Sequence, residues 1–391
     1  MAEADLEQLQ RDLVEELRRK QVLSNAGAAM AFSAVPRHLF LPDVHPRDVY
    51  RDQAITLKSG ADGGTISSAS QPTIMAVMLE QLDLSAGLNV LEIGAATGFN
   101  AALIKNSVGS GGSVTTLEID NELCERARDN LQAAGYSDVK VVNCDAARGY
   151  ESRAPYDRII ATAGVWDVPT AWLRQLREEG KLVLPIWLDG VQLSAAFTKQ
   201  PDGAWISCDN RPCAFVYLQG LAAGPQIRKR IGSSSLEILA DDVDKIDAAA
   251  LHLLLSDDQE IYHLDGNLAP EDFWFGFQLY LMLHEPPRYV FAVYAIPDGE
   301  TYYGMEGDGV LLFTPGSAAF APYAGGGSVH CFGGSPAFMK MQSLLENWRS
   351  HNTTLLDRIR LKLIPKALGR PSDGAGKLFT RDDHTLQVWL D

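Results

Sequence analysis

The sequence predicts an α/β fold built on a mainly parallel sheet, closed by antiparallel strands and followed by an α+β domain. Three observations lead to this prediction. Short apolar segments alternate with helical ones between residues 89 and 186, strand-like segments follow residue 186, and a linker-like stretch, GLAAGPQ, occupies residues 220–226. Alternation of short apolar strands with helices is typical of βα units, whose strands pair in parallel.

The length of the chain favours two domains. It has 391 residues, whereas one domain usually contains about 100 to 200 residues. We place a catalytic domain over residues 1–220, with a helical, substrate-facing part over residues 1–85, and an accessory domain over residues 227–391.

Each segment of the first domain has its own signal. Leucines at helical spacing predict an amphipathic helix over residues 4–23. The predicted strands are NVLEIG, SVTTLEID, VKVVNCD, YDRIIATA and KLVLPI, and the predicted helices between them are FNAALIKNSV, NELCERARDNLQAAG and PTAWLRQLREEG. Two further strands, VQLSAAFTKQ and CAFVYLQG, would close the sheet in the antiparallel direction.

The second domain has strand and helix signals in a less regular order. RYVFAVYAIP, GVLLFTP and LQVWL read as strands, and AFMKMQSLLENWRSH reads as a long helix. No catalytic motif is visible in this part, so we expect it to hold a peptide substrate.

Composition excludes several classes of function. The net charge of -16 disfavours nucleic acid as a partner, because such binding depends on many Lys and Arg residues that neutralise phosphates. The acidic N-terminus resembles neither a signal peptide nor a membrane span. The five cysteines form no CxxC pair, which favours reduced thiols over a disulfide framework or a metal site. We therefore expect a cytoplasmic protein with no nucleic-acid, membrane or metal partner, and its oligomeric state stays open.

The segment LEIGAATGFN, residues 91–100, carries the clearest chemical signal. Gly94 and Gly98 would let the backbone turn after the strand and come close to a ligand. Dinucleotide-binding folds use a similar turn, so the glycines alone leave the class open. Glu118 ends the next strand, where an acid can accept both ribose hydroxyls of an adenosyl ligand.

A second acid, Asp145, follows the third strand. A dinucleotide enzyme need not have an acid there. Two acids after consecutive strands therefore favour an adenosyl site over a pair of solvated loop carboxylates.

Motif I of the class I S-adenosylmethionine methyltransferases, E/D-x-G-x-G-x-G, is similar to LEIGAATGFN, with Ala96 in place of the middle glycine. Residues 1–220 resemble the protein-L-isoaspartate O-methyltransferase family in seven segments that occur in the family's order: VPRHLFLP, YRDQAITL, TISSASQP, LEIGAATGFNAA, APYDRIIATA, EGKLVLPI and CAFVYL. This resemblance implies a Rossmann-like sheet, S-adenosylmethionine as cofactor, and methyl transfer to a side-chain or isoaspartyl carboxylate of a peptide or protein.

The same resemblance implies the site residues. In the family the serine of TIS lies beside the reacting carboxylate, and here extra residues separate TIS from SQP. The corresponding serine is Ser67 counted from the left and Ser70 counted from the right. We favour Ser70, since Pro72 at the first helical turn fixes its position relative to the helix, and Ser68 can share the role.

The remaining expected site residues fall into two groups. The expected cofactor-binding residues are Glu92, Gly94, Ala95, Gly98, Glu118, Ile119, Asp145, Ala146 and Thr162. The expected substrate-binding residues are Pro36, Arg37 and Val216. His38 lies in a family segment at a variable position, and we do not assign it as a base.

Carboxylate methylation needs little proton chemistry. A carboxyl group with a pKa of about 3.9 is ionised at neutral pH, so the enzyme needs no general base. Transfer to a small-molecule hydroxyl would call for such a base, which the sequence does not supply.

Two departures from the family bear on the substrate. The lengthened TISSASQP segment and the residues beyond 220 resemble a bacterial subfamily that methylates aspartate in modified ribosomal peptides, after which the ester closes to a succinimide. We favour that substrate. A repair-type isoaspartate enzyme is the alternative, and a small-molecule O-methyltransferase or a non-catalytic binding protein of the same fold is a further one.

Overall fold

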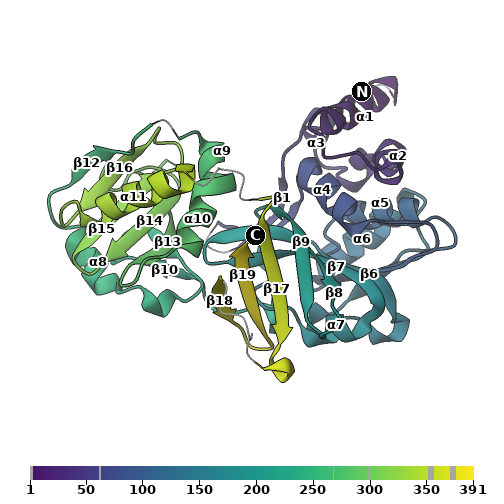
Figure 1. Cartoon of the computed structure of the whole chain (residues 1–391). Helices are drawn as coiled ribbons and strands as arrows, with labels where there is room; N and C mark the ends of the chain where they lie inside the picture. Colours follow the sequence, from purple (N-terminus) through teal and green to yellow (C-terminus); the bar gives the residue numbers. More distant parts are fainter. Residues whose placement is uncertain (1–2, 61–62, 267, 298, 351–355, 370–375) are drawn as a thin grey trace.

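A ten-stranded sheet runs through the computed structural model and takes strands from both halves of the chain (Figure 1). The structure describes residues 3–60, 63–266, 268–297, 299–350, 356–369 and 376–391. From one edge to the other, the strands of the sheet are β18 (Lys377–Thr380), β19 (His384–Leu390), β17 (Ile359–Pro365), β9 (Trp205–Pro212), β8 (Val191–Lys199), β7 (Leu176–Leu188), β6 (Tyr156–Ala161), β3 (Asn89–Ile93), β4 (Ser113–Glu118) and β5 (Lys140–Asn143).

The half of the sheet from β7 to β5 is parallel, which confirms the predicted α/β fold. The helices of this part are α1 (Glu3–Arg19), α2 (Ala26–Ala34), η1 (Arg37–Phe40), α3 (Pro46–Val49), α4 (Pro72–Leu82), α5 (Phe99–Val108), α6 (Asn121–Ala133), η2 (Ala146–Arg148), η3 (Glu151–Arg153) and α7 (Thr170–Gln175). Strands β3, β4 and β6 are buried along most of their length. Strands covered on both faces read as continuous apolar runs, and this is why the sequence locates them.

Two predicted segments differ in the structure. The helix predicted over residues 169–180 ends at Gln175, because Leu176 already pairs with Tyr156 as the first residue of the long strand β7. The strand predicted over residues 213–220 is wrong, and the ladder runs through β9 instead. The backbone of Phe215 pairs with a side chain and not with a strand. The amide of Gln192 accepts from the Phe215 N–H at 2.8 Å and donates to the Phe215 carbonyl at 3.0 Å.

A short hairpin stands apart from the large sheet and consists of β1 (Ile55–Ser59) and β2 (Thr65–Ala69). Ser67 and Ser68 of the TISSASQP segment lie within β2. The hairpin leads directly into α4.

The C-terminal half forms a second, antiparallel sheet with helices packed against it (Figure 1). Its strand order is β10 (Arg228–Arg230), β11 (Glu237–Leu239), β13 (Val290–Ala295), β14 (Gly309–Thr314), β15 (Ser317–Pro322), β16 (Ser328–Phe332) and β12 (Glu260–His263). The helices are η4 (Gly220–Ala222), η5 (Val243–Lys245), α8 (Ala248–Leu254), α9 (Pro270–Asp272), η6 (Phe273–Phe277), α10 (Gln278–Leu283), α11 (Pro336–Ser350) and η7 (Lys366–Leu368).

The end of the chain departs from the expected domain assignment. Strands β17, β19 and β18 leave the second sheet and join the first, where Leu361 faces Ser207 and Leu363 faces Trp205 in the β17–β9 ladder. Residues 359–390 therefore extend the catalytic sheet, although we expected them in a separate domain over residues 227–391. The rest of that division stays a prediction.

A buried carboxylate joins the two halves. Asp189, at the β7–β8 turn, is fully buried and accepts hydrogen bonds from the amide of Asp241 at 2.7 Å, from Lys245 at 3.0 Å and from Lys377 at 2.9 Å. Burial alone would raise the pKa of Asp189, but the two lysines outweigh it and the pKa is lowered. This cluster and one continuous apolar core fix the second sheet against the first.

None of the helices within the described residues is long and apolar enough to cross a membrane.

Candidate active site

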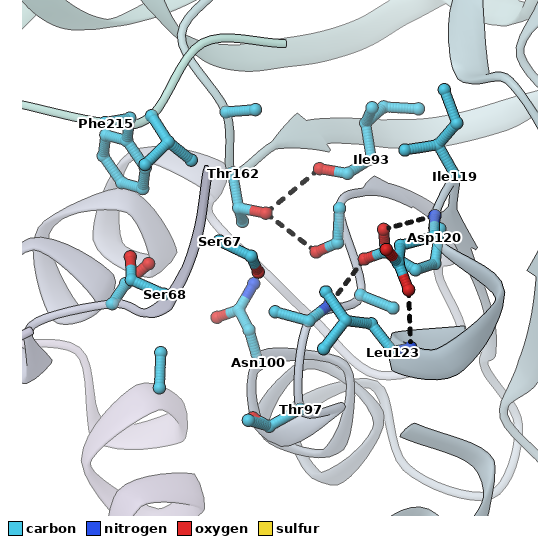
Figure 2. A pocket seen from close by; sticks show the side chains of 18 of the residues that line it. Ser67, Ser68, Ile93, Thr97, Asn100, Ile119, Asp120, Leu123, Thr162 and Phe215 are labelled. Carbon is cyan, nitrogen blue, oxygen red and sulfur yellow. Dashed lines mark hydrogen bonds between the residues drawn. The ribbon is translucent and has the colours of Figure 1, made fainter. Parts of the chain in front are cut away.

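A pocket opens where strands β3, β4 and β6 end and the β1–β2 hairpin approaches (Figure 2). The pocket is partly open to solvent. The carboxyl ends of parallel strands are the usual ligand site of such a sheet. Eleven of the fifteen expected site residues line the pocket, and the four that do not are Pro36, Glu92, Gly98 and Asp145.

The glycine turn after β3 forms one wall of the pocket. Gly94 has φ +97° and a Cβ there would meet the Thr162 hydroxyl at 2.6 Å, while Gly98 has φ +85° and begins α5. Ala96 also has a positive φ of +47°, a conformation that costs energy for a residue with a side chain. Any larger residue at Gly94 would displace the Thr162 side chain, so the sequence keeps glycine here.

Glu118 holds this turn in place. One carboxylate oxygen accepts from the Ala96 amide at 2.9 Å and the other from the Asp120 amide at 3.1 Å. Burial raises the pKa of Glu118. Each oxygen of a carboxylate has a second lone pair, so Glu118 can still accept from the two ribose hydroxyls, as expected for an adenosyl ligand.

Thr162 fixes the turn from the other side. Its hydroxyl lies 3.0 Å from the carbonyl of Ile93 and 2.8 Å from that of Gly94, and Figure 2 draws both contacts. The hydroxyl supplies one proton, which it shares between two main-chain acceptors. The expected residues Ala95, Ile119 and Ala146 also line the pocket.

Glu92 lies beneath the pocket and not on its lining. It is fully buried and accepts from Asn100 Nδ2 at 2.8 Å and from the Thr116 hydroxyl at 2.6 Å. Burial raises its pKa to about 7. Glu92 therefore does not line the pocket, whereas its partner Asn100 does, and a role of Glu92 in cofactor binding stays a prediction. Sequence reasoning missed Asn100, since an asparagine in a helix carries no motif of its own.

Asp145 is also displaced from its expected place on the lining. One of its oxygens accepts from the Ala147 amide at 2.8 Å and the other from the Leu221 amide at 2.7 Å. A Cβ at Gly220 would lie 2.3 Å from the second oxygen. Asp145 thus ties η4, at the start of the linker, to the edge of the pocket. Its contact with an adenine amino group stays a prediction.

All three candidate serines line the pocket. Successive residues of a strand point to opposite sides, and in Figure 2 Ser67 projects toward Asn100 and Thr162 while Ser68 lies nearer Phe215. Ser70 follows the strand. The N-cap residue of helix α4 is Gln71 and not a serine, so helix capping does not account for these hydroxyls.

Arg37 brings a buried positive charge to the same lining. Its side chain is 1% exposed, donates to the carbonyl of Ser70 at 2.9 Å and lies over the ring of Phe99 at 5.3 Å. Its Nε has no acceptor among the described residues. Burial lowers the pKa of Arg37 to about 10, so the guanidinium stays charged at neutral pH. No carboxylate among the described residues forms an ion pair with it, and an anion in the pocket would supply one.

The neighbours of Arg37 have structural roles. Pro36 precedes η1 and does not line the pocket. His38 lies outside the lining as well, with its Nδ1 at 2.8 Å from the Tyr50 hydroxyl. Burial lowers the pKa of His38. His38 therefore lies away from the pocket lining, and we do not assign it as a base.

The segment around Val216 closes the pocket opposite the glycine turn. The carbonyl of Val216 accepts from the Gly164 amide at 2.8 Å, and the Leu218 amide donates to the carbonyl of Gly164 at 2.9 Å. Phe215, which the sequence analysis did not single out, lines the pocket beside Val216. Both residues are therefore fixed before any ligand arrives.

Lys58 and Asp120 join the hairpin to the opposite wall. Their ion pair measures 2.5 Å, and both residues line the pocket. Neither was predicted, because the partners lie far apart in the sequence. The ion pair holds β1 across the mouth of the pocket, beside the ribose position expected at Glu118.

The chain resembles known proteins over the part that builds this pocket. Residues 7–223 match the family model described as Protein-L-isoaspartate(D-aspartate) O-methyltransferase (PCMT). A protein-L-isoaspartate O-methyltransferase of Archaeoglobus fulgidus is 37% identical over 199 residues, which cover 51% of this chain and 87% of the relative. One of Hyperthermus butylicus is 39% identical over 218 residues, covering 54% of this chain and 88% of the relative.

A solved structure extends the likeness to most of the chain. A protein-L-isoaspartate O-methyltransferase with 24% identity aligns with a TM-score of 0.51 and covers 90% of this chain and 96% of its own. At this identity the alignment supports the fold alone. It reaches beyond residue 223, where the family match ends.

Proposed function

The chain belongs to the protein-L-isoaspartate O-methyltransferase family, a family of S-adenosylmethionine-dependent methyltransferases, and we propose that it methylates the free carboxylate of isoaspartyl residues in peptides and proteins. The names of its relatives support this repair-type reaction over the aspartate of a modified ribosomal peptide, which the sequence had favoured. A cytoplasmic location is part of the same proposal.

The residues at the carboxyl edge of the sheet suit the cofactor. The left-handed turn at Gly94 and Gly98 packs too closely against the protein for a Cβ and brings the main chain to the edge of the pocket, and Glu118 retains lone pairs for two hydroxyls. Asn100 Oδ1 is buried and has no partner among the described residues. When bound, S-adenosylmethionine supplies an electrophilic methyl group on a positive sulfonium.

The buried charge of Arg37 is the observation that carries the proposal. Burial of a cation is costly, and Asp52 and the Ser70 carbonyl offset only part of that cost, because the pKa of Arg37 is still lowered. The residue lines a pocket that also presents three serine hydroxyls. A substrate carboxylate would compensate the charge, and a serine hydroxyl would donate to one of its oxygens. The carboxylate is ionised at neutral pH, so the chain has only to orient it and to exclude water.

Paired peptides test this function. The enzyme and S-adenosylmethionine would be incubated with two peptides that differ only in carrying isoaspartate or aspartate. We expect the isoaspartyl peptide to gain one methyl group and then to lose methanol, as the ester closes to a succinimide, while the aspartyl peptide stays unchanged.

The other outcomes separate the alternatives. Methylation of the aspartyl peptide alone would overturn the repair-type proposal and return the modified-peptide substrate to first place. Cofactor binding in a calorimeter without transfer to either peptide would instead point to a small-molecule acceptor or a non-catalytic binding protein.

A role of the C-terminal half in holding the peptide belongs to the same proposal. Deletion of residues 227–391 is a poor test of it, because the deletion removes β17 from its ladder with β9. Point substitutions where the linker meets the catalytic domain leave that ladder in place.

A further inference from the structure

A second pocket lies on the other side of the segment that closes the active site. We call it the linker pocket, because residues 223–228, which run from the end of η4 to the first residue of β10, form its outer wall. Its volume is about 650 Å³, within the range of about 300 to 1000 Å³ that is usual for pockets that bind small ligands. The family match ends at residue 223, so most of this outer wall lies beyond it.

Aromatic side chains form the inner wall. Trp187 and Tyr217 meet edge to face, with ring centroids 5.5 Å apart, and Trp187 is 3% exposed. Trp166 donates from its indole nitrogen to Asp241 at 3.1 Å, and the guanidinium of Arg381 lies 4.5 Å from the centre of its ring. These contacts fix the three rings before a ligand arrives. Rigid aromatic walls favour flat, apolar groups, which gain ring contacts as well as burial.

The two pockets share a wall and a strand. Ile66, Val216, Tyr217, Leu218 and Gln219 contribute to both. Along β2, Thr65 and Ile66 reach the linker pocket while Ser67 and Ser68 reach the active site. Neighbouring residues of an extended chain are about 3.3 Å apart. The linker pocket therefore begins within two or three residues of the candidate serines.

The charge of the pocket lining restricts the kind of side chain that the linker pocket can bind. Arg228 is the only charged side chain among the described residues that line the linker pocket. It pairs with Glu237 at 2.9 Å but stays half exposed. A lysine or arginine of a ligand would be repelled by this positive group, whereas an uncharged ring would not.

We propose that the linker pocket receives an aromatic side chain that lies within three residues of the isoaspartyl group of the peptide substrate. This inference rests on the proposed function and adds a sequence preference to it. The catalytic pocket recognises the carboxylate, and the linker pocket selects peptides by a neighbouring ring.

A peptide series and one blocking variant test the proposal. The peptides carry one isoaspartate and have Trp, Phe, Ala or Lys at each of the three positions on either side. Ala223 is exposed and lines the linker pocket without touching the serines or the cofactor wall, so Ala223→Trp would fill the pocket from the linker. Ala133→Trp, at an exposed position of α6 that lines neither pocket, is the matched control.

We expect KM to fall about five- to tenfold when a ring replaces Ala at one of these positions, as burial of an aromatic side chain less the cost of ordering it allows. Lys should give no such gain. Ala223→Trp should abolish the preference and leave kcat and KM for the Ala peptide unchanged, whereas Ala133→Trp should retain it.

The outcomes that oppose the proposal are distinct. Methylation with equal KM for ring and Ala peptides at every position would overturn the linker-pocket proposal and leave the isoaspartate function intact. A preference that survives in Ala223→Trp would overturn it as well, by placing the ring elsewhere. Failure to methylate any isoaspartyl peptide would overturn the proposed function and this inference together.

Discussion

Arg37 donates a hydrogen bond to the main-chain carbonyl of Ser70 at 2.9 Å, so a buried cation and a candidate catalytic serine lie side by side in the lining of the pocket. The bond ties η1 to the start of α4. This bond restrains Ser70 relative to Arg37, so in the proposed function a substrate carboxylate would meet both groups in one arrangement.

Removal of this charge should impair catalysis. In Arg37→Met the apolar stem remains, but the Ser70 carbonyl loses its donor, which costs about 1 to 3 kcal/mol of stability if nothing replaces it. We expect kcat/KM for an isoaspartyl peptide to fall about 10- to 100-fold, the usual worth of a hydrogen bond to a charged group. Steady-state kinetics and a thermal melt would measure the two effects.

Arg47→Met is the control, because Arg47 is exposed on the neighbouring helix α3. It should keep wild-type kinetics. A wild-type kcat/KM in Arg37→Met would refute the assignment of Arg37 to the carboxylate.

The three serines can be separated by single substitutions. Ser70→Ala should lower kcat/KM about tenfold, because one hydrogen bond to the carboxylate is lost. Ser67→Ala and Ser68→Ala should cost less, and none of the three should change the affinity for S-adenosylhomocysteine in a calorimetric titration. A larger loss in Ser67→Ala would transfer the role to that residue, which points toward Asn100 and Thr162 (Figure 2).

Local signals in the sequence sufficed for the parallel strands of the catalytic half. Buried parallel strands such as β3 are apolar throughout, and the turn at Gly94 requires a residue without a side chain. Both facts can be read within a few residues. The positions of Ser67, Ser70 and Arg37 on one pocket follow from the family resemblance and agree with the structure.

Distant pairings could not be predicted in this way. Leu361 faces Ser207 across the β17–β9 ladder, and no local pattern names a partner so far along the chain. The same holds for Lys58 with Asp120 and for Asp145 with Leu221, whose contacts appear only when the chain is folded. Glu92 was expected at the cofactor, but the motif does not show that its carboxylate is fully buried and bonded to Asn100, which lines the pocket instead.

The raised pKa of Glu92 predicts a pH dependence of stability. Its pKa rises from 4.5 to about 7 on burial, so between these values the folded protein binds more protons than the unfolded chain. Stability from this group is therefore full below about pH 4.5 and is lost as the pH rises toward 7. The total loss is about 3 kcal/mol, at 1.36 kcal/mol for each pKa unit.

Glu92→Gln isolates this effect, because the amide keeps the shape of the side chain and does not titrate. The free energy of unfolding of the variant relative to wild type should increase by about 2.5 kcal/mol between about pH 5 and about pH 8. Urea unfolding at several pH values measures the difference. If that difference does not change with pH, Glu92 does not titrate in this range.

The tie between Asp145 and the linker predicts that a single methyl group at Gly220 disturbs the cofactor site. A Cβ at Gly220 would lie 2.3 Å from the Asp145 carboxylate, and the φ of +85° disfavours any side chain. Gly135 has nearly the same φ, +84°, but a Cβ there would meet nothing within 4 Å. Both Gly→Ala variants share the backbone penalty of about 1 kcal/mol, and only Gly220→Ala adds the clash.

We therefore expect Gly220→Ala to lose more stability than Gly135→Ala and to bind S-adenosylhomocysteine several-fold more weakly, while Gly135→Ala binds it as wild type does. Chemical denaturation gives the first comparison and calorimetry the second. Equal losses of stability in the two variants would mean that the linker yields to the methyl group without straining Asp145. Unchanged cofactor affinity in a destabilised Gly220→Ala would show that Asp145 anchors the linker and has no part in holding the adenosyl group.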